Sequence, residues 1–201
     1  MTPTRTLASC VFTFVATSAV TAGAEGPASG AAADRWADHW HVGIETSPAF
    51  FAMGGYFGDL AVVAPALPRW RFVASVYALD IPTAFIDSAN PGWTQRDEGV
   101  GLGAQRTFGH RERGGWYAGL NLGVQRRRAA RSDGSGAAIE EDVEVEGGFR
   151  WFPVRGWGLT ITPSFGFAVP LHRSAAPVVD GMTYVYKPFS IIPGVAIGWD
   201  F

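Results

Sequence analysis

Cysteine and charge are both scarce in this sequence. The chain of 201 residues has one cysteine, Cys10, and this residue lies in a segment that we expect to be removed. Disulfides and thiolate metal sites are therefore excluded from the mature protein. Charged residues make up 17% of the chain, against roughly 25% in a typical soluble domain. So few charges would hardly cover a surface that faces water, and the net charge of −2 does not indicate a nucleic-acid partner.

A long uninterrupted apolar run is also missing. The stretch from Leu7 to about Val20 is broken by threonines and a serine, whereas a membrane-spanning helix needs roughly 20 apolar residues. This stretch follows Arg5 and precedes the small residues Ala22 to Ala24, which is the pattern of a cleaved export signal. We therefore expect a signal peptide over residues 1–24, followed by a flexible leader over residues 25–38.

Helical periodicity is not found after residue 24, and alternation at period two recurs instead. Apolar residues alternate with small or polar ones, and turn residues separate the alternating segments, which indicates β-strands. We place eight antiparallel strands at residues 39–47, 56–64, 70–81, 98–108, 115–128, 138–152, 157–169 and 189–201.

The connections between these strands alternate in length. Residues 65–68, 109–114 and 153–156 are tight turns, whereas 48–55, 82–97, 130–137 and 170–188 are mostly longer. Short turns at one end and longer loops at the other are typical of a transmembrane barrel, which must be closed because hydrocarbon offers no partner for a free strand edge. The predicted fold class is all-β, a single closed antiparallel up-and-down transmembrane β-barrel over residues 39–201.

The two faces of the predicted strands differ in side-chain size. Trp157, Leu159 and Ile161 share one face of their strand, while Thr160 and Thr162 share the other. Small inward residues fit the narrow interior of an eight-stranded barrel, so we expect the bulky face to meet lipid. A soluble, lipocalin-like barrel with apolar residues inside is the alternative. Its outer face would need lysine and glutamate, whereas the face opposite the bulky one is mostly glycine, serine and threonine.

Aromatic residues gather at the ends of the predicted strands. One set falls at the end with the short turns: Trp40, Trp70, Phe108, Trp116, Trp151, Trp157 and Phe201. Aromatic rings favour the membrane interface, where an apolar body and a polar edge are both satisfied. We therefore predict an aromatic girdle at the periplasmic end.

The last eleven residues, IIPGVAIGWDF, alternate up to a terminal aromatic residue. Their ending, Gly-Trp-Asp-Phe, resembles the C-terminal signal of Gram-negative outer-membrane barrel proteins. The resemblance implies location in the outer membrane and handover to the barrel-assembly machinery, with Trp199 and Phe201 as the recognised side chains. The stretches Ala66 to Phe72 and Arg150 to Pro153, with Thr162-Pro163, resemble segments of small barrel proteins that have no assigned activity.

Acidic residues stand at every second position on the inward face of residues 138–152. They are Glu140, Asp142, Glu144 and Glu146. These carboxylates cannot all ionise at low cost in a confined space unless cations oppose them. The candidate cations are Arg71, Arg127, Arg150, His39 and His41. We expect a buried ion-pair network that fills the lumen and prevents conduction; a calcium-type site and a loose, wet interior are the alternatives.

Arginines cluster at the outer end of residues 115–128. They are Arg126, Arg127, Arg128 and Arg131. Arginine binds phosphate through two parallel hydrogen bonds, and lipopolysaccharide phosphates lie at this level of the outer leaflet. By parity Arg127 turns inward, so Arg126, Arg128 and Arg131 are the candidate lipopolysaccharide contacts. A solvated charge run is the alternative.

His172-Arg173-Ser174 resembles the motif of outer-membrane lipid A deacylases, in which a further acid orients a histidine that activates a serine. This sequence departs from that pattern, because the nearest following acid is Asp180 in the same predicted loop and no glutamate follows Glu146. His172 and Ser174 are nevertheless kept as catalytic candidates.

Taken together, the residues favour an outer-membrane barrel with a structural or surface-interaction role over an enzyme. A lipid-modifying hydrolase and a soluble ligand-binding barrel are the alternative functions. The expected partners are outer-membrane lipid, lipopolysaccharide and the barrel-assembly machinery. No cofactor and no metal ion are expected, and the oligomeric state stays open.

Overall fold

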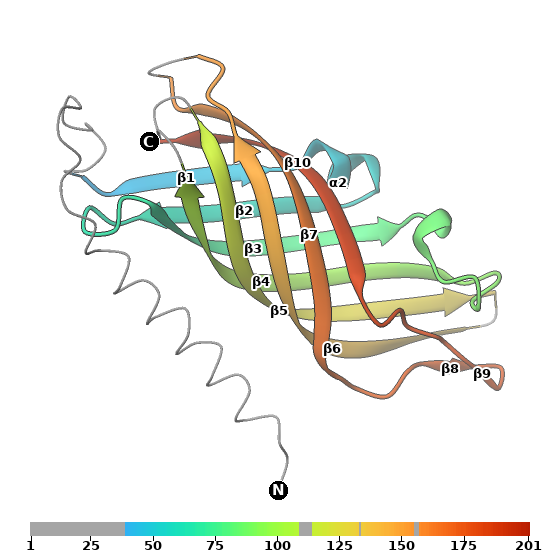
Figure 1. Cartoon of the computed structure of the whole chain (residues 1–201). Helices are drawn as coiled ribbons and strands as arrows, with labels where there is room; N and C mark the ends of the chain where they lie inside the picture. The colour runs from blue at the N-terminus through green and yellow to red at the C-terminus, as the bar shows by residue number, and fades with distance from the viewer. Residues whose placement is uncertain (1–38, 109–113, 133, 155–156) are drawn as a thin grey trace, which may run out of the picture.

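The chain forms a closed barrel of antiparallel strands in the order β1-β10-β7-β6-β5-β4-β3-β2 (Figure 1). The computed structural model describes residues 39–108, 114–132, 134–154 and 157–201. The predicted fold class, an eight-stranded up-and-down barrel, is confirmed. The predicted signal peptide, residues 1–24, and the predicted leader, residues 25–38, lie outside the described residues.

The strands differ widely in length. The barrel consists of β1 (His41–Thr46), β2 (Tyr56–Val63), β3 (Trp70–Ile81), β4 (Thr94–Phe108), β5 (Gly115–Arg131), β6 (Gly134–Arg150), β7 (Leu159–Arg173) and β10 (Ser190–Asp200). A separate hairpin pairs β8 (Val178–Val179) with β9 (Met182–Thr183), and two short helices, α2 (Pro48–Ala52) and η1 (Thr83–Phe85), lie in loops. In the described ranges no helix is both long and apolar enough to cross a membrane.

The two ends of the barrel carry connections of different length. β1 begins and β10 ends at the same end, which also carries the connections after β2, β4 and β6; we call it the turn end. The opposite end, which carries α2, η1 and the β8–β9 hairpin, is the loop end (Figure 1). The seven residues of the predicted aromatic girdle all lie at the turn end: Trp40, Trp70, Phe108, Trp116, Trp151, Trp157 and Phe201.

The central strands continue further toward the loop end than the sequence pattern predicted. β5 and β6 pair from Gly115↔Arg150 as far as Arg131↔Gly134, so the longer loop predicted over residues 130–137 is wrong. These extensions contain alanine, glycine and serine without apolar alternation, because a wall that projects beyond lipid needs no apolar face. Main-chain pairing alone therefore extends the strands where the side-chain pattern stops.

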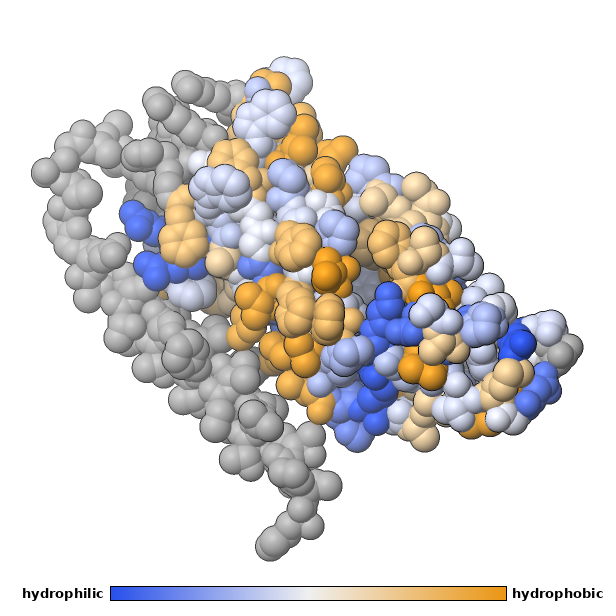
Figure 2. All heavy atoms as spheres, turned by 45° about the vertical axis from the view of Figure 1, so that its right-hand side comes forward, coloured by the Kyte–Doolittle hydropathy of each residue, from blue (hydrophilic) through white to orange (hydrophobic). Residues whose placement is uncertain are grey.

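Bulky apolar side chains cover the outside of the barrel wall (Figure 2). On β7, Thr160 and Thr162 point inward and are 0% and 3% exposed, whereas Phe165 on the opposite face is 56% exposed. The predicted side-chain assignment is confirmed for this strand. The lipocalin-like alternative is wrong, since it requires the apolar face to be enclosed.

We predict that Gly158→Ala destabilises the barrel more than Gly181→Ala. Gly158 has a φ of +75°, and a Cβ there would overlap the Asp200 carbonyl oxygen and lie 3.0 Å from Trp199 Nε1. Gly181 has a φ of +73° but nothing lies within 4 Å of its Cβ position. Overpacking at Gly158 should cost about 1–3 kcal/mol beyond the roughly 1 kcal/mol strain that both variants share. Urea unfolding in lipid vesicles measures both losses, and equal losses would contradict the prediction.

Candidate functional site

The lumen contains two clusters of buried charge. The turn-end cluster consists of Glu45, Arg71, Arg150 and Asp200. The loop-end cluster consists of Asp97, Arg127, Glu140, Asp142 and Arg173. Both clusters are built by inward positions of the strands, so the alternation of each strand decides which charged side chains meet.

Glu45 on β1 is the centre of the turn-end cluster. Its Oε1 atom lies 2.5 Å from Arg71 Nη1 of β3 and 3.4 Å from Arg150 Nε of β6. Arg71 Nη2 also lies 3.6 Å from Asp200 Oδ1 of β10. Because all four side chains are at most 8% exposed, charges that would be costly singly are held as a mutually compensated group.

Arg150 is further held by neutral neighbours. Its Nη2 atom donates to Gln105 Oε1 at 3.0 Å, and its guanidinium lies 5.2 Å from the centre of the Tyr117 ring. A planar guanidinium can donate at its edge and stack on its face at the same time. The turn-end cluster is thereby tied to β4 and β5 as well.

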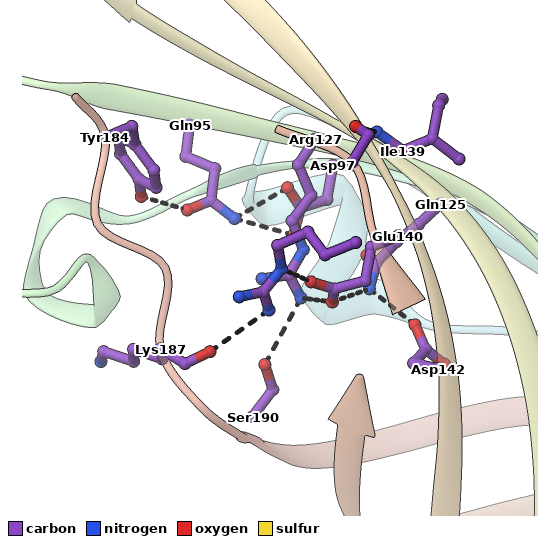
Figure 3. A network of polar contacts seen from close by, with 12 residues as sticks. Gln95, Asp97, Gln125, Arg127, Ile139, Glu140, Asp142, Tyr184, Lys187 and Ser190 are labelled. Atoms are coloured by element: carbon purple, nitrogen blue, oxygen red, sulfur yellow. Dashed lines mark hydrogen bonds and ion pairs between the residues drawn. The ribbon is translucent and has the colours of Figure 1, made fainter. Parts of the chain in front are cut away.

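Glu140 on β6 is the centre of the loop-end cluster (Figure 3). It is 2% exposed, and it forms ion pairs with Arg127 Nη2 at 3.0 Å and with Arg173 Nε. Gln125 Nε2 donates to Glu140 Oε1 at 3.1 Å and to Asp142 Oδ2 at 2.7 Å. This amide lies between two carboxylates, which reduces their mutual repulsion.

The loop between β7 and β10 lies over the loop-end cluster. Arg173 Nη2 donates to the Lys187 carbonyl oxygen at 3.3 Å, and its guanidinium lies 4.5 Å from the centre of the Tyr186 ring. Tyr184 donates its hydroxyl to Gln95 Oε1 at 2.5 Å (Figure 3). Burial raises the pKa of Tyr184 to about 12, so this hydroxyl keeps its proton at neutral pH. The loop is therefore fixed to the charged residues below it.

Arg173 reaches the lumen because of a β-bulge, which sequence parity did not reveal. Asp142 pairs with Pro170, but the next pair is Glu141↔His172, so one extra residue on β7 shifts the alternation. This shift turns Arg173 inward and leaves His172 outward. The sequence pattern ended this strand at residue 169, and it contained no signal for the bulge.

The predicted acidic row does not act as one network. Glu140 and Asp142 belong to the loop-end cluster, but Glu144 and Glu146 form no ion pair with any described residue, which corrects the expectation. Glu146 accepts a hydrogen bond from Gln105 Nε2 at 2.8 Å, and Glu144 lies opposite Asn121. Among the described residues, no three histidine, cysteine, aspartate or glutamate side chains are placed to hold a metal ion. Uncharged amides thus accompany the carboxyls in the middle of the lumen.

The same architecture occurs among solved bacterial barrel structures. The N-terminal β-barrel domain of Pseudomonas aeruginosa OprF is 13% identical, with a TM-score of 0.53 and coverage of 81% of this chain and 96% of that domain. The chain has the fold of small eight-stranded outer-membrane barrels. The resemblance predicted from the sequence is confirmed at the level of the fold.

Two further structures are similar at lower scores. A major outer membrane protein from Thermus thermophilus has 13% identity, a TM-score of 0.49 and coverage of 81% and 98%. Neisserial surface protein A has 11% identity, a TM-score of 0.48 and coverage of 80% and 95%. No protein-family model and no curated protein matches the chain.

The arginines at the loop end of this barrel point to opposite faces of the wall, as the alternation along β5 predicts. Arg126 and Arg128 are exposed on the outer face of β5, and Arg127 is buried in the lumen. Arg131 differs from the other candidates, because its Nη1 atom lies 2.5 Å from the Met182 sulfur of β9. Its guanidinium is thus directed to the hairpin, and the lipid-facing candidates reduce to Arg126 and Arg128.

In the predicted His-x-Ser motif, Ser174 forms hydrogen bonds with the main chain of the neighbouring strand. His172 belongs to β7 and Ser174 follows directly, so placing His172 in a loop was wrong. The Ile139 amide donates to Ser174 Oγ at 2.9 Å, and the Ser174 amide donates to the Ile139 carbonyl oxygen at 2.9 Å. Asp180, the acid nearest in sequence, has a φ of 52° in the turn of the β8–β9 hairpin. These hydrogen bonds join β6 to β7, and the arrangement does not favour a catalytic triad of Ser174, His172 and Asp180.

We predict that Glu140→Gln destabilises the barrel, whereas Glu144→Gln does not. Glu140→Gln leaves the half-buried Arg173 without its carboxylate and leaves the buried Arg127 with only the more distant Asp97, at 3.6 Å, which should cost about 3 kcal/mol. Glu144→Gln, the matched control on the same strand and face, removes no cation's partner and should change stability by less than about 1 kcal/mol. Urea unfolding in vesicles measures both values. Equal effects would show that the ion pairs do not determine stability.

Proposed function

We propose that this protein is a closed barrel of a Gram-negative outer membrane, with a lumen that does not conduct and a structural or surface-interaction role carried by its outer loops. The outer surface supports membrane insertion. On β5, outward Trp116, Leu120, Leu122 and Val124 precede Arg126, so an apolar face ends where charge begins. The eight residue steps from Trp116 to Val124 correspond to about 26 Å along the strand. At a tilt of 35–45° this is roughly 18–21 Å along the membrane normal, which is most of the apolar band of about 25 Å on such barrels.

The observation that carries the closed lumen is the presence of a buried ionic cluster toward each end. The turn-end cluster joins β1, β3, β6 and β10 across the interior. The loop-end cluster lies beneath Tyr184 and Tyr186, and Trp93, Ala129 and Val179 pack with Tyr184 above it. An ion would have to displace paired charges at both levels, which is costly in a low-dielectric interior.

We predict that the purified protein produces no steady conductance in planar-bilayer recordings. Hydrated ions would have to separate the paired side chains at both clusters in order to pass, so only the background current of the bilayer is expected. A porin inserted under the same conditions provides the positive control, and heat-shifted migration on a gel verifies that the barrel is folded. Stable unitary steps from the folded protein would contradict the closed lumen.

The loop-end rim of the outer face supports contact with lipopolysaccharide phosphates. Arg96 on β4 is engaged by Asp80 at 2.9 Å and by Glu98 at 3.1 Å. Arg128 lies directly opposite Arg96 in the register, so it faces a like charge, and its guanidinium contacts Ser135 Oγ at 3.2 Å. An anion beside Arg128 would offset this repulsion, since like charges placed opposite each other destabilise a sheet.

We predict that replacing both Arg126 and Arg128 by alanine lowers the amount of lipopolysaccharide that copurifies with the barrel. The loss of two exposed guanidiniums removes the phosphate donors on this rim. Arg106→Ala is the control, because Arg106 lies on the outer face near the turn end, 5.6 Å from the Phe108 ring. Phosphate analysis of detergent-purified protein measures the difference, and an unchanged ratio in the double variant would refute the contact.

The C-terminal residues support a role for the assembly machinery. Trp199 and Phe201 are 39% and 67% exposed on the outer face at the turn end. An exposed alternating aromatic ending is available to a partner that recognises the last strand. We therefore propose the assembly machinery as a partner of the chain, in addition to lipopolysaccharide.

A further inference from the structure

Carboxyl groups outnumber guanidiniums in the lumen. Along the described strands, the two clusters contain four arginines: Arg71, Arg127, Arg150 and Arg173. Eight carboxyl groups of the same strands face this interior: Glu45, Asp59, Asp97, Glu140, Asp142, Glu144, Glu146 and Asp200. If all of them were ionised, negative charge would remain uncompensated in a low-dielectric interior, which is costly. Protonation of some of these carboxyls removes this cost.

Asp59 of β2 is placed unfavourably for a negative charge. It lies directly opposite Glu45 of β1 on the inner face of the wall, and the uncharged Ser75 of β3 lies on its other side. Asp59 and Glu45 are 9% and 4% exposed, and like charges at opposite positions destabilise a sheet. Asp59 Oδ1 is buried and forms no hydrogen bond with any residue in the described ranges. These surroundings favour a neutral Asp59 carboxyl.

The more distant groups around Asp59 also carry more negative than positive charge. From β6, across the lumen, the charges of Glu144 and Glu146 act on Asp59. From β3, the charge of Arg71 acts on Asp59 with the opposite sign. Tyr77, the next inward residue of β3, carries no charge and donates its hydroxyl to a glutamine of β5 at 3.1 Å. Arg71 is therefore the cation that an ionised Asp59 would attract.

Arg71 also joins the first and last strands of the barrel. Its Nη1 atom lies 2.5 Å from Glu45 Oε1 of β1, and its Nη2 atom lies 3.6 Å from Asp200 Oδ1 of β10. The seam between β1 and β10 is short, with four paired residues on each strand. Arg71 Nη2 forms no hydrogen bond within the described part of the chain, so Asp200 holds it loosely. A new negative charge on Asp59 would compete with Asp200 for this group.

We propose that a proton on Asp59 is a switch for the seam between β1 and β10. With the proton in place, Arg71 binds Glu45 and Asp200 and joins the two strands. When the pH rises, the O–H bond of the Asp59 carboxyl breaks and the proton passes to water. Water approaches through a turn-end cavity of about 20 Å³, lined by Arg71 and Asp200 among others, which has room for one molecule. The Asp59 carboxylate then draws Arg71 away from Asp200, and the seam loosens. This regulatory device goes beyond the proposed function.

Infrared spectroscopy of the full-length protein in phosphatidylcholine vesicles tests the proton. Aspartate side-chain carboxyls carry ¹³C, which separates their bands from those of glutamate. We expect a ¹³C-shifted C=O band of a protonated carboxyl at neutral pH, its loss as the pH rises, and its absence from Asp59→Asn. Asp80→Asn is the control, because Asp80 is an exposed outer-face carboxyl paired with Arg96 at 2.9 Å, and its band should be unchanged.

Two infrared results would overturn the proposal. One is a labelled wild-type protein without a protonated-carboxyl band, which needs no variant. The other is a labelled band that persists in Asp59→Asn, because another aspartate then holds the proton. Heat-shifted migration on a gel verifies folding, and Asp59→Ala is the second variant if Asp59→Asn does not fold.

Amide hydrogen exchange of residues 43–46 and 197–200 tests the seam. The wild type and Asp59→Asn are compared at the same pH, so that intrinsic exchange rates cancel. We expect equal exchange below the pH at which the infrared band disappears, and exchange about tenfold faster in the wild type above it. Equal exchange on both sides would overturn the switch even if Asp59 holds a proton. Faster exchange in all strands would also overturn it, because the whole barrel would then be loosened.

Discussion

Hydrogen bonding of the main chain within a medium that offers no partners is the constraint on which this structure depends. In hydrocarbon each N–H and C=O group must be satisfied by the protein, and strands β2 to β7 achieve this with a neighbour on either side. Once the main chain is used in this way, side chains can only point outward or inward. Most ionisable residues at membrane depth are therefore directed into the lumen, whereas Arg106 and Glu141 lie on the outer face near the two ends of the apolar wall. The chemistry of the interior follows from closure.

The lumen compensates its charge unevenly along the axis. Toward the two ends, Glu45 and Glu140 are each held by two guanidiniums, and these rigid forks join strands that are distant in sequence. In the middle, Glu144 and Glu146 have amides as neighbours. A fixed cation opposes a carboxylate's charge, whereas an amide only donates hydrogen bonds to it. Removal of charge should therefore be tolerated in the middle of the lumen and not at the centres of the two clusters.

Parity explains both what could be predicted from the sequence and what could not. The alternation predicted eight strands, the inward direction of Thr160 and the separation of Arg127 from Arg126, because each depends only on counting along one strand. Glu45 and Arg173 were missed for different reasons. Glu45 is an isolated acid on a short strand and acquires its role only when closure brings β3 and β6 to it. Arg173 needed a bulge, which changes parity without a sequence signal.

Strand length was also only partly predictable. A side-chain pattern reports where a strand is apolar on one side, so it ends near the membrane boundary. The pairing of β5 with β6 continues as far as Arg131↔Gly134, because hydrogen bonds between main chains need no particular side chain. The sequence therefore located the membrane-facing part of these strands and missed the part that projects beyond it.

The seam between the first and last strands is where closure and local sequence conflict. Ser47 has extended φ and ψ of −117° and 117°, and Pro48 at the start of α2 has no N–H with which to continue the ladder, so β1 ends at Thr46. β10 continues toward the loop end as far as Ser190, which leaves it longer than its partner. Pro193 then removes a donor on the free edge. Pro48 thus ends β1, and Pro193 leaves the longer β10 with one fewer unpaired N–H group. The sequences of both strands therefore favour an open half of the seam.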